Sequence, residues 1–240
     1  MAEITYNKTA LDIISALTTI NQSVVFQHDE DDDSVVISKA ADANKSIAYI
    51  FSAPKEVFDF ESTEEDSECG FYNFNDFYTL FNVFNEPTLE QDGVDITVKE
   101  NKSKIKFRLT DQELIKKTFN RVEFEDPEVS FMMDYELIKK IKDLASGNKV
   151  NADRVKFSID GTELKYDLFN TKHHNTFDET IEIENDGDAE FSIEVDMKIW
   201  NKIPNASYKV CMKEEGLLRL TMVRDDEMKV EIYTADMESD

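Results

Sequence analysis

Apolar side chains recur with helical spacing in four segments of the chain. In each segment they return every three or four positions, which places them on one face of an amphipathic helix. Asn73, Asp134 and Asp196 stand where N-caps are expected, and Gly147 and Pro204 stand where helices commonly end. The predicted helices cover residues 10–20, 74–84, 135–147 and 197–203.

The segments between the predicted helices alternate apolar and polar residues, which is the pattern of strands with one buried face. After the third helix, alternation marks strands at residues 155–159, 164–168, 181–183 and 191–195. Further strands are predicted at 94–98, 105–109, 208–212, 218–222 and 228–232. We therefore expect each helix to be followed by several antiparallel strands.

The starts of the four helices are spaced by about 60 to 66 residues, which is typical of an internal structural repeat. Two repeats make one domain of ordinary size, so we predict two similar domains at residues 1–120 and 130–240. A connector at residues 121–129, which contains Asp126 and Pro127, joins them. The predicted fold class is α+β, with two helices packed on antiparallel sheet in each domain.

The charge of the chain bears on its partners. Acidic residues outnumber basic ones by 52 to 27, and the formal net charge is -25. Such a surface repels phosphate at long range, which argues against a simple DNA-binding protein. Contact with DNA remains open if basic groups gather on one concave face, because the local potential governs contact. With 40% hydrophobic residues, each domain has enough apolar side chains for a core.

The two cysteines, Cys69 and Cys211, stand in no metal-binding spacing, so neither a disulfide framework nor a zinc site is expected. The N-terminal segment lacks the basic start and apolar run of a signal peptide. No apolar run approaches the roughly 18 residues that a membrane span needs. We expect a protein of the reducing cytoplasm without a membrane partner.

Other motifs that could bind a metal or carry catalysis do not indicate a site. His28 precedes an acidic run that lacks the glycine and glutamate positions of an EF-hand, so a solvated loop explains it better. His173 and His174 are adjacent, and adjacent side chains point apart more often than they chelate. No glycine-rich phosphate loop or nucleophile elbow is found. We expect no metal, no cofactor and no enzymatic activity.

Three segments resemble the DNA sliding clamps, and the T4-like phage type in particular. They are TALDIISALTTIN in the first helix, FNDFYTLFNVF in the second, and the C-terminal segment YKVCMKEEGLLRLTMVRDDEMKVEIYTA. The order of helix and strands, repeated along the chain, is also similar to this family, which includes the eukaryotic and archaeal proliferating-cell clamps. The resemblance covers essentially the whole chain.

The resemblance implies a DNA clamp fold and a closed ring of six domains, so this two-domain chain would form a homotrimer. It implies a ring that encircles duplex DNA without reading its sequence and tethers the replicative DNA polymerase. An ATP-dependent clamp loader would open the ring. For a T4-like phage it also implies a role as coactivator of late transcription, in the cytoplasm of the host cell.

Six lysines are candidates for contacting DNA phosphates: Lys8, Lys139, Lys140, Lys142, Lys198 and Lys202. Those of the third helix lie away from its apolar stripe, and the last two share a face at i, i+4 spacing. A solvated helix face is the plain alternative. However, a local excess of lysine is less expected in so acidic a chain, and the resemblance places basic groups on helices that line the ring.

Four residues are candidates for binding partner peptides, and this role rests on the resemblance. Val122 and Phe124 are apolar residues in a polar connector, which the clamp fold sets beside the last strand and the turn at Pro204. Together with Tyr233 they would form a groove for a short apolar peptide. Alternatively, Val122 and Phe124 pin the connector to the core.

Basic residues also stand at every second position just before and along the predicted strand at 105–109, where the residues between them are mostly apolar. The basic positions are Lys102, Lys104, Lys106 and Arg108. Simple solvation, protection of an edge strand, and a contact with an acidic neighbouring subunit are all consistent with this pattern.

An acidic DNA mimic that inhibits a DNA-binding enzyme is the alternative function. It accounts for the charge of the chain but not for its internal repeat. A mimic would be monomeric or dimeric, whereas a clamp requires a closed ring.

Overall fold

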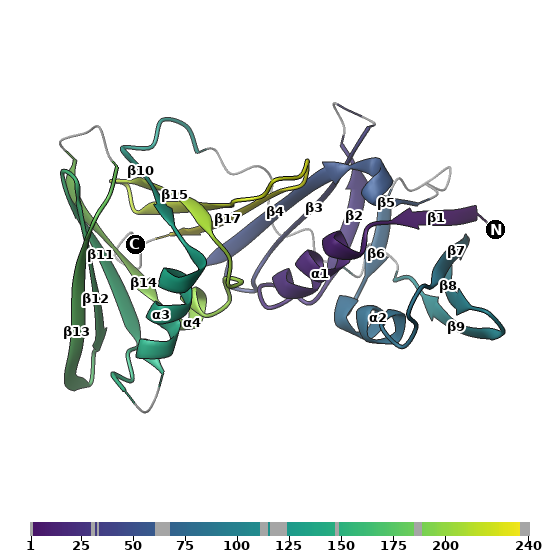
Figure 1. Cartoon of the computed structure of the whole chain (residues 1–240), viewed down its shortest axis with the longest axis horizontal. Helices are drawn as coiled ribbons and strands as arrows, with labels where there is room; N and C mark the ends of the chain where they lie inside the picture. The colour runs from purple at the N-terminus through teal and green to yellow at the C-terminus, as the bar shows by residue number, and fades with distance from the viewer. Residues whose placement is uncertain are drawn as a thin grey trace. The chain divides into compact units, whose positions relative to one another are not determined.

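The computed structural model describes residues 2–29, 32, 34–60, 68–110, 115, 124–146, 149–184 and 189–235. The chain divides into two compact units. Unit 1 holds residues 1–45, 49–119 and 226–230, and unit 2 holds residues 46–48, 120–225 and 231–240. Figure 1 labels their helices and strands.

Unit 1 contains helices α1 (Lys8–Leu17) and α2 (Phe74–Phe81). Both begin at an asparagine N-cap. The side chain of Asn7 accepts a hydrogen bond from the backbone N–H of Ala10, and that of Asn73 accepts one from Asn75. These bonds satisfy amide groups that the first helical turn leaves unpaired, so short helices can start at these positions.

Helix α1 ends earlier than the apolar pattern predicts. The Thr18 hydroxyl donates to the carbonyl of Ser15 at 2.6 Å, which ties the last turn closed. The chain then continues as a tight turn, in which the N–H of Ile20 donates to the carbonyl of Leu17. Ile20 is still buried, so the apolar spacing continues past the end of the helix and the prediction was one turn too long.

The strands of unit 1 form two runs in antiparallel pairing. One is a five-stranded sheet with the order β5 (Phe58–Asp59), β1 (Ala2–Tyr6), β7 (Thr88–Asp92), β8 (Asp95–Glu100) and β9 (Ser103–Arg108). The other has the order β6 (Glu68–Phe71), β2 (Val24–His28), β3 (Val35–Ala41) and β4 (Ile47–Pro54), after which a 3-10 turn spans Lys55–Val57.

The core of unit 1 is rich in phenylalanine. Phe26 stacks on Phe58 with ring centroids 4.5 Å apart, and Phe71 contacts Phe77 of α2 at 4.9 Å. Phe107 of β9 also reaches Phe77, at 5.6 Å. Each such ring buries a large apolar area, so these contacts fix the sheets against α2.

Unit 2 contains helices α3 (Tyr135–Ala145) and α4 (Met197–Trp200). Asp134 and Asp196 cap them as predicted, with carboxylates that accept from the backbone N–H groups of Leu137 and Lys198. Helix α4 is shorter than predicted. Beyond it the chain forms a turn in which the Ile203 N–H donates to the Trp200 carbonyl.

The strands of unit 2 also form two antiparallel runs. A four-stranded sheet has the order β13 (His173–Glu182), β12 (Glu163–Asn170), β11 (Arg154–Asp160) and β14 (Glu190–Asp196). The second run has the order β10 (Val129–Met133), β15 (Tyr208–Lys213), β16 (Leu217–Met222) and β17 (Lys229–Ala235).

Strand β13 is longer than the predicted 181–183. Its first four residues, from His173 to Thr176, are all exposed, so they carry no apolar alternation that would reveal a strand. They form one because β12 beside them supplies the hydrogen-bond ladder.

The core of unit 2 lies between its helices and sheets. Trp200 of α4 is fully buried and packs on Phe157 of β11, with ring centroids 5.0 Å apart. Helix α3 buries Ile138, Ile141 and Ala145. The predicted α+β fold class, with two helices and antiparallel sheet in each unit, is confirmed.

Within the described residues, no helix has the length and apolar character that crossing a membrane requires.

Candidate nucleic-acid interface and partner site

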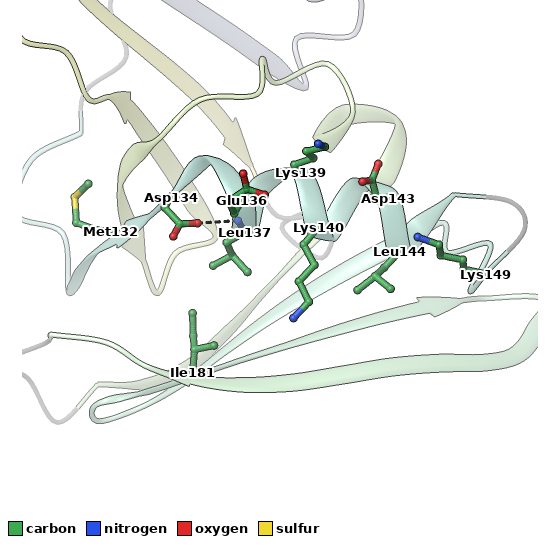
Figure 2. A pocket seen from close by; sticks show the side chains of 10 residues that line it. All are labelled: Met132, Asp134, Glu136, Leu137, Lys139, Lys140, Asp143, Leu144, Lys149 and Ile181. Carbon is green, nitrogen blue, oxygen red and sulfur yellow. Dashed lines mark hydrogen bonds between the residues drawn. The ribbon is translucent and has the colours of Figure 1, made fainter.

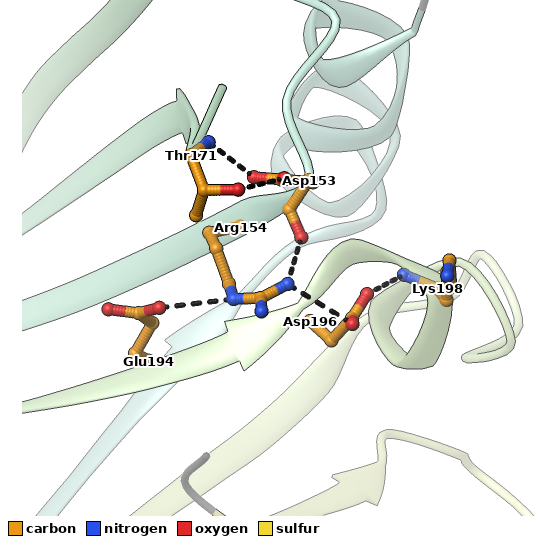
Figure 3. A network of polar contacts seen from close by, with 6 residues as sticks. All are labelled: Asp153, Arg154, Thr171, Glu194, Asp196 and Lys198. Atoms are coloured by element: carbon orange, nitrogen blue, oxygen red, sulfur yellow. Dashed lines mark hydrogen bonds and ion pairs between the residues drawn. The ribbon is translucent and has the colours of Figure 1, made fainter. Parts of the chain in front are cut away.

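A half-buried polar network sets the start of α4 (Figure 3). The guanidinium of Arg154 pairs with Glu194 and Asp196, each at 3.1 Å. Asp196 uses its other oxygen to accept from the backbone N–H of Lys198 at 2.7 Å. One carboxylate therefore both caps the helix and ties it to β11, and so fixes where Lys198 leaves the fold.

Lys139 and Lys140 leave α3 on opposite sides (Figure 2). Lys140 points toward the sheet, where its ammonium binds Glu179 of β13 at 2.5 Å. The Tyr166 hydroxyl donates to the same carboxylate. The Lys140 ammonium and the Tyr166 hydroxyl hold the pKa of Glu179 below its usual range. Lys139 is exposed, and its ammonium lies 5.9 Å from the ring centroid of Tyr135.

The ammonium of Lys142 joins α3 to the turn after α4. It donates to the carbonyl of Ile203, and to the side-chain oxygen of Asn205 at 2.8 Å. Burial in this contact lowers the pKa of Lys142 to about 8. Lys142 therefore sits beside α4 as a partly buried link between the two helices.

Lys198 is exposed on α4, whereas Lys202 is half-buried and lies in the turn beyond the helix. The helical i, i+4 face predicted for this pair is therefore wrong, because α4 ends at Trp200. Since Lys142 contacts the same turn, the structure still brings lysines of α3 and α4 together. Spacing along a single helix could not reveal this.

The corresponding surface of unit 1 is mostly uncharged. The Asn75 side chain bridges α1 and α2, accepting from the Ser15 hydroxyl at 2.9 Å and donating to Thr18 at 2.7 Å. The Tyr78 hydroxyl donates to Asp12 at 2.6 Å. These side chains bind one another, so this surface offers phosphate few free donors. Tyr78 itself is half-buried on α2.

Lys8 begins α1 on this surface. Its ammonium donates to the side-chain oxygen of Asn82 at 2.8 Å and lies 5.7 Å from the ring centroid of Phe81. Lys8 is exposed, so one cationic group accompanies the Asp12 carboxylate and the neutral side chains of α1 and α2.

Two of the predicted partner-site residues are in contact. The ring of Phe124 lies 6.2 Å from that of Tyr233, centroid to centroid. The carbonyl of Pro204 accepts from the Tyr208 hydroxyl at 2.8 Å, in the turn that leads into β15. Val122 lies outside the described residues.

Arg219 belongs to the same site and was missed from the sequence. Its guanidinium carbon lies 4.6 Å from the centroid of the Phe124 ring, and its Nη1 donates to the Phe124 carbonyl at 3.3 Å. Arg219 stands opposite Tyr233 in the pairing of β16 with β17. Strand register, which the sequence alone does not give, places these residues together.

Each unit has a sheet that ends at an unpaired edge within the described ranges: β9 in unit 1 and β13 in unit 2 (Figure 1). The β9 edge is basic and the β13 edge is acidic. Lys104 stands opposite Lys99 of β8, and Glu182 stands opposite Glu163 of β12. Like charges directly opposite one another disfavour pairing, so each edge would gain from a neighbour of the other sign.

A hollow of about 710 Å³ lies between α3 and the β13 edge (Figure 2). Leu137 and Leu144, which belong to the apolar face of the helix predicted at 135–147, are only half-buried and line the hollow together with Ile181. Glu136 and Asp143 lie on its rim. Lys139, Lys140 and Lys149 also line the hollow, so an apolar floor beside the β13 edge carries a rim of mixed charge.

The sequence matches no protein-family model and no curated protein. Its structure is nevertheless similar to solved structures of PCNA. A structure of A. fulgidus PCNA with the C-terminal region of FEN-1 bound matches with a TM-score of 0.70 at 18% identity, over 99% of each chain. PCNA from Entamoeba histolytica matches with a TM-score of 0.74 at 13% identity, over 98% of each chain.

PCNA from Thermococcus kodakaraensis matches with a TM-score of 0.73 at 13% identity, over 98% of this chain and 99% of that one. The likeness spans both units and both runs of strands in each. The clamp fold that the three sequence segments implied is therefore confirmed, and the chain has the fold of the PCNA-type sliding clamps.

Proposed function

We propose that this chain is one subunit of a closed ring that encircles duplex DNA and tethers DNA polymerase to it. The observation that carries the proposal is the pair of complementary edges, basic on β9 and acidic on β13, in a chain with the clamp fold. Edge strands with open hydrogen-bonding groups are usually protected or paired. Head-to-tail pairing of β9 with β13 of the next copy would satisfy both edges.

The charges along the two edges favour this pairing. Lys102 and Lys104 are exposed at the start of β9, and Asp178 and Glu182 are exposed on β13. An antiparallel register that sets Lys104 opposite Asp178 places Lys102 opposite Thr180, diagonal to Glu182. Opposite charges would then lie within reach of one another and offset the like-charge pairs within each subunit. The apolar floor of the hollow beside β13 would be covered by the same neighbour.

Three copies would close the ring. The resemblance to sliding clamps implies six domains around the hole, and each chain supplies two units. A heterologous interface that repeats by a fixed rotation closes into a ring, so no edge remains open. The assembly we propose is therefore a homotrimer.

The lysines of α3 and α4 are the proposed DNA contacts. Lys139 and Lys198 are exposed and best placed to reach phosphates. Lys202 is half-buried in the turn after α4, and Lys8 is exposed at the start of α1 in unit 1. Lys140 and Lys142 add positive charge while remaining bound to groups of the chain itself. Contacts to phosphate carry no sequence information, which suits a ring that must slide.

The proposed docking place for partner peptides is the apolar site at Phe124 and Tyr233. The proposal includes Val122 and Pro204, which were chosen from the sequence. The A. fulgidus PCNA structure has the C-terminal region of FEN-1 bound, which supports peptide docking as a property of this fold. We extend the proposal to an ATP-dependent clamp loader, and to late transcription if the chain comes from a T4-like phage.

Mass photometry tests the ring. We expect a species of about three times 27.8 kDa at micromolar concentration. The double substitution Lys102→Glu and Lys104→Glu should dissociate it into folded monomers, because like charges would then face each other across the interface. Combining these with Asp178→Lys and Glu182→Lys should restore the trimer, since both edges are then reversed together.

A matched control places the same reversal away from the edges, as Lys39→Glu and Lys209→Glu on β3 and β15. A dominant monomer of the parent chain, or a compact dimer, would contradict the ring. A trimer that persists after the β9 charge reversal would show that the interface is formed by other strands. It would not contradict the ring.

A further inference from the structure

The ring of Phe124 occupies a site on strands β15, β16 and β17 of unit 2. It lies against the Arg219 guanidinium at 4.6 Å, the Tyr233 ring at 6.2 Å and the Lys213 ammonium at 5.9 Å, each measured to the Phe124 ring centroid. The Phe124 carbonyl accepts from Arg219 at 3.3 Å. The connector is thus held at this residue by both its side chain and its backbone.

The floor of the site is a row of residues that pair across neighbouring strands. Cys211 of β15 stands opposite Arg219 of β16, which stands opposite Tyr233 of β17. Arg219 donates to the Cys211 sulfur at 3.6 Å, while its Nε is buried without a hydrogen-bond partner in the described part of the chain. The guanidinium is thus held by Cys211 and the Phe124 carbonyl while it lies against the Phe124 ring.

The site is already full. Phe124 is 7% exposed and Tyr233 is 9% exposed, so the two rings offer almost no apolar surface to an incoming peptide. Affinity for an apolar anchor comes from surface removed from water, and these rings have nearly none left to remove. A partner that uses this site must first take the place of Phe124.

We propose that Phe124 is an internal occupant of the partner site and that a partner peptide displaces it, which rests on the proposed role of this site in partner docking. The connector then shows what the site accepts: an aromatic side chain flanked by carboxylates, as Phe124 is flanked by Glu123, Glu125 and Asp126. Lys213 and Arg219 provide the complementary cations. The partner is accordingly an acidic peptide with one aromatic anchor.

Displacement makes binding depend on how often Phe124 leaves. The apparent affinity is the intrinsic affinity multiplied by the fraction of molecules whose site is open. If Phe124 occupies the site nine-tenths of the time, binding is therefore weakened about tenfold. Removing the Phe124 ring abolishes that penalty. Truncating Phe124 should therefore strengthen peptide binding, whereas truncating a residue of the floor should weaken it.

A peptide with the sequence of residues 120–127, NRVEFEDP, is a probe of defined chemistry for this site. Labelled with a fluorophore, it should bind the full-length Phe124→Ala variant at least tenfold more tightly than the parent chain by fluorescence anisotropy. Adding Tyr233→Ala to that variant should reduce binding to the level of the parent or below. The same peptide with alanine in place of its phenylalanine is the control and should bind neither protein.

A second measurement uses the intact side chain. The full-length chain is prepared with 4-fluorophenylalanine at position 124 and followed by fluorine NMR. Excess NRVEFEDP peptide should move the resonance toward that of the free amino acid, because the ring leaves its site and becomes exposed to water. Circular dichroism of each variant checks the fold.

Weaker peptide binding by Phe124→Ala with an intact fold would overturn the proposal and make Phe124 a wall of the groove. A fluorine resonance unchanged at saturating peptide would overturn it as well. Mass photometry of the same samples reports the trimer separately, so loss of the displacement mechanism is distinguishable from loss of the ring.

Discussion

The partners of individual lysines decide which of them are available to a ligand. Lys140 is held by Glu179 and Lys142 by the turn after α4, whereas Lys139 and Lys198 extend from exposed positions. An ammonium already bound to a carboxylate must break that contact before it can bind phosphate. The exposed pair should therefore contribute more to DNA binding than the bound pair.

We predict that Lys139→Ala combined with Lys198→Ala weakens binding of the ring to duplex DNA by about tenfold at low salt. With fewer phosphate contacts, binding releases fewer counterions from the DNA. The slope of log affinity against log salt should fall by roughly one per lost contact. Fluorescence anisotropy across a salt series measures both. Lys39→Ala with Lys209→Ala changes the net charge equally on other strands and should leave the slope unchanged.

Equal slopes for the two double variants would mean that total charge, and not the helix surface, governs DNA contact. The sequence could indicate this surface but not sort its lysines. Helical spacing places Lys139 and Lys140 equally far from the apolar stripe, yet only the sheet beside α3 brings Glu179 to one of them. The partner of a side chain depends on tertiary contacts that spacing does not encode.

At the scale of elements, capping residues define the helices more sharply than apolar spacing does. Asn73, Asp134 and Asp196 were all predicted as N-caps, and each accepts the expected backbone hydrogen bond. The ends were harder to place, because buried residues such as Ile20 continue the apolar pattern beyond the helix. A local hydrogen bond can be predicted from sequence when a single side chain, such as that of an N-cap, accepts it from the adjacent backbone.

The positions of strands were predictable only where burial alternates. Residues 155–159 and 164–168 show this alternation and lie in β11 and β12. The exposed start of β13 shows none, and the register that joins Arg219 to Tyr233 depends on the whole sheet. The residues that build the Phe124 site therefore became visible only in the structure.

Asp196 is the element-scale residue with the clearest energetic consequence. We predict that Asp196→Ala lowers the free energy of unfolding by roughly 1 to 2 kcal/mol, because it removes an N-cap and one of the carboxylates paired with Arg154. Asp196→Asn should cost less, since the amide oxygen still accepts from the Lys198 N–H. Urea unfolding followed by circular dichroism measures the difference. Equal losses for both variants would show that the ion pair, and not the cap, dominates.

At the scale of the whole molecule, charge and topology would have opposite effects on DNA binding by the proposed ring. Three copies would carry a formal charge of about -75, so the assembly as a whole repels DNA. A ring does not need high affinity, because a duplex threaded through it cannot leave sideways. The fold therefore makes sense of a composition that, by itself, argues against a DNA-binding protein.

We predict that the protein is retained on circular DNA and lost from linear DNA. Rings that close around a nicked plasmid during incubation at high protein concentration should co-elute with it in gel filtration at a salt concentration that abolishes phosphate contacts. Cutting the plasmid at one site should release them, since a ring slides off a free end. The Lys102→Glu and Lys104→Glu variant is the control, because it should not close and so should not be retained on either DNA.

The outcome separates the candidate functions by their physics. Electrostatic binding alone weakens equally on both DNA forms as salt rises, because phosphate density is the same in each. Topological binding depends on the absence of a free end and hardly at all on salt. Equal retention on circular and linear plasmid would exclude the clamp. No retention on either, together with tight binding to a DNA-binding enzyme, would favour an acidic mimic. A loss confined to linear DNA is expected only of a closed ring.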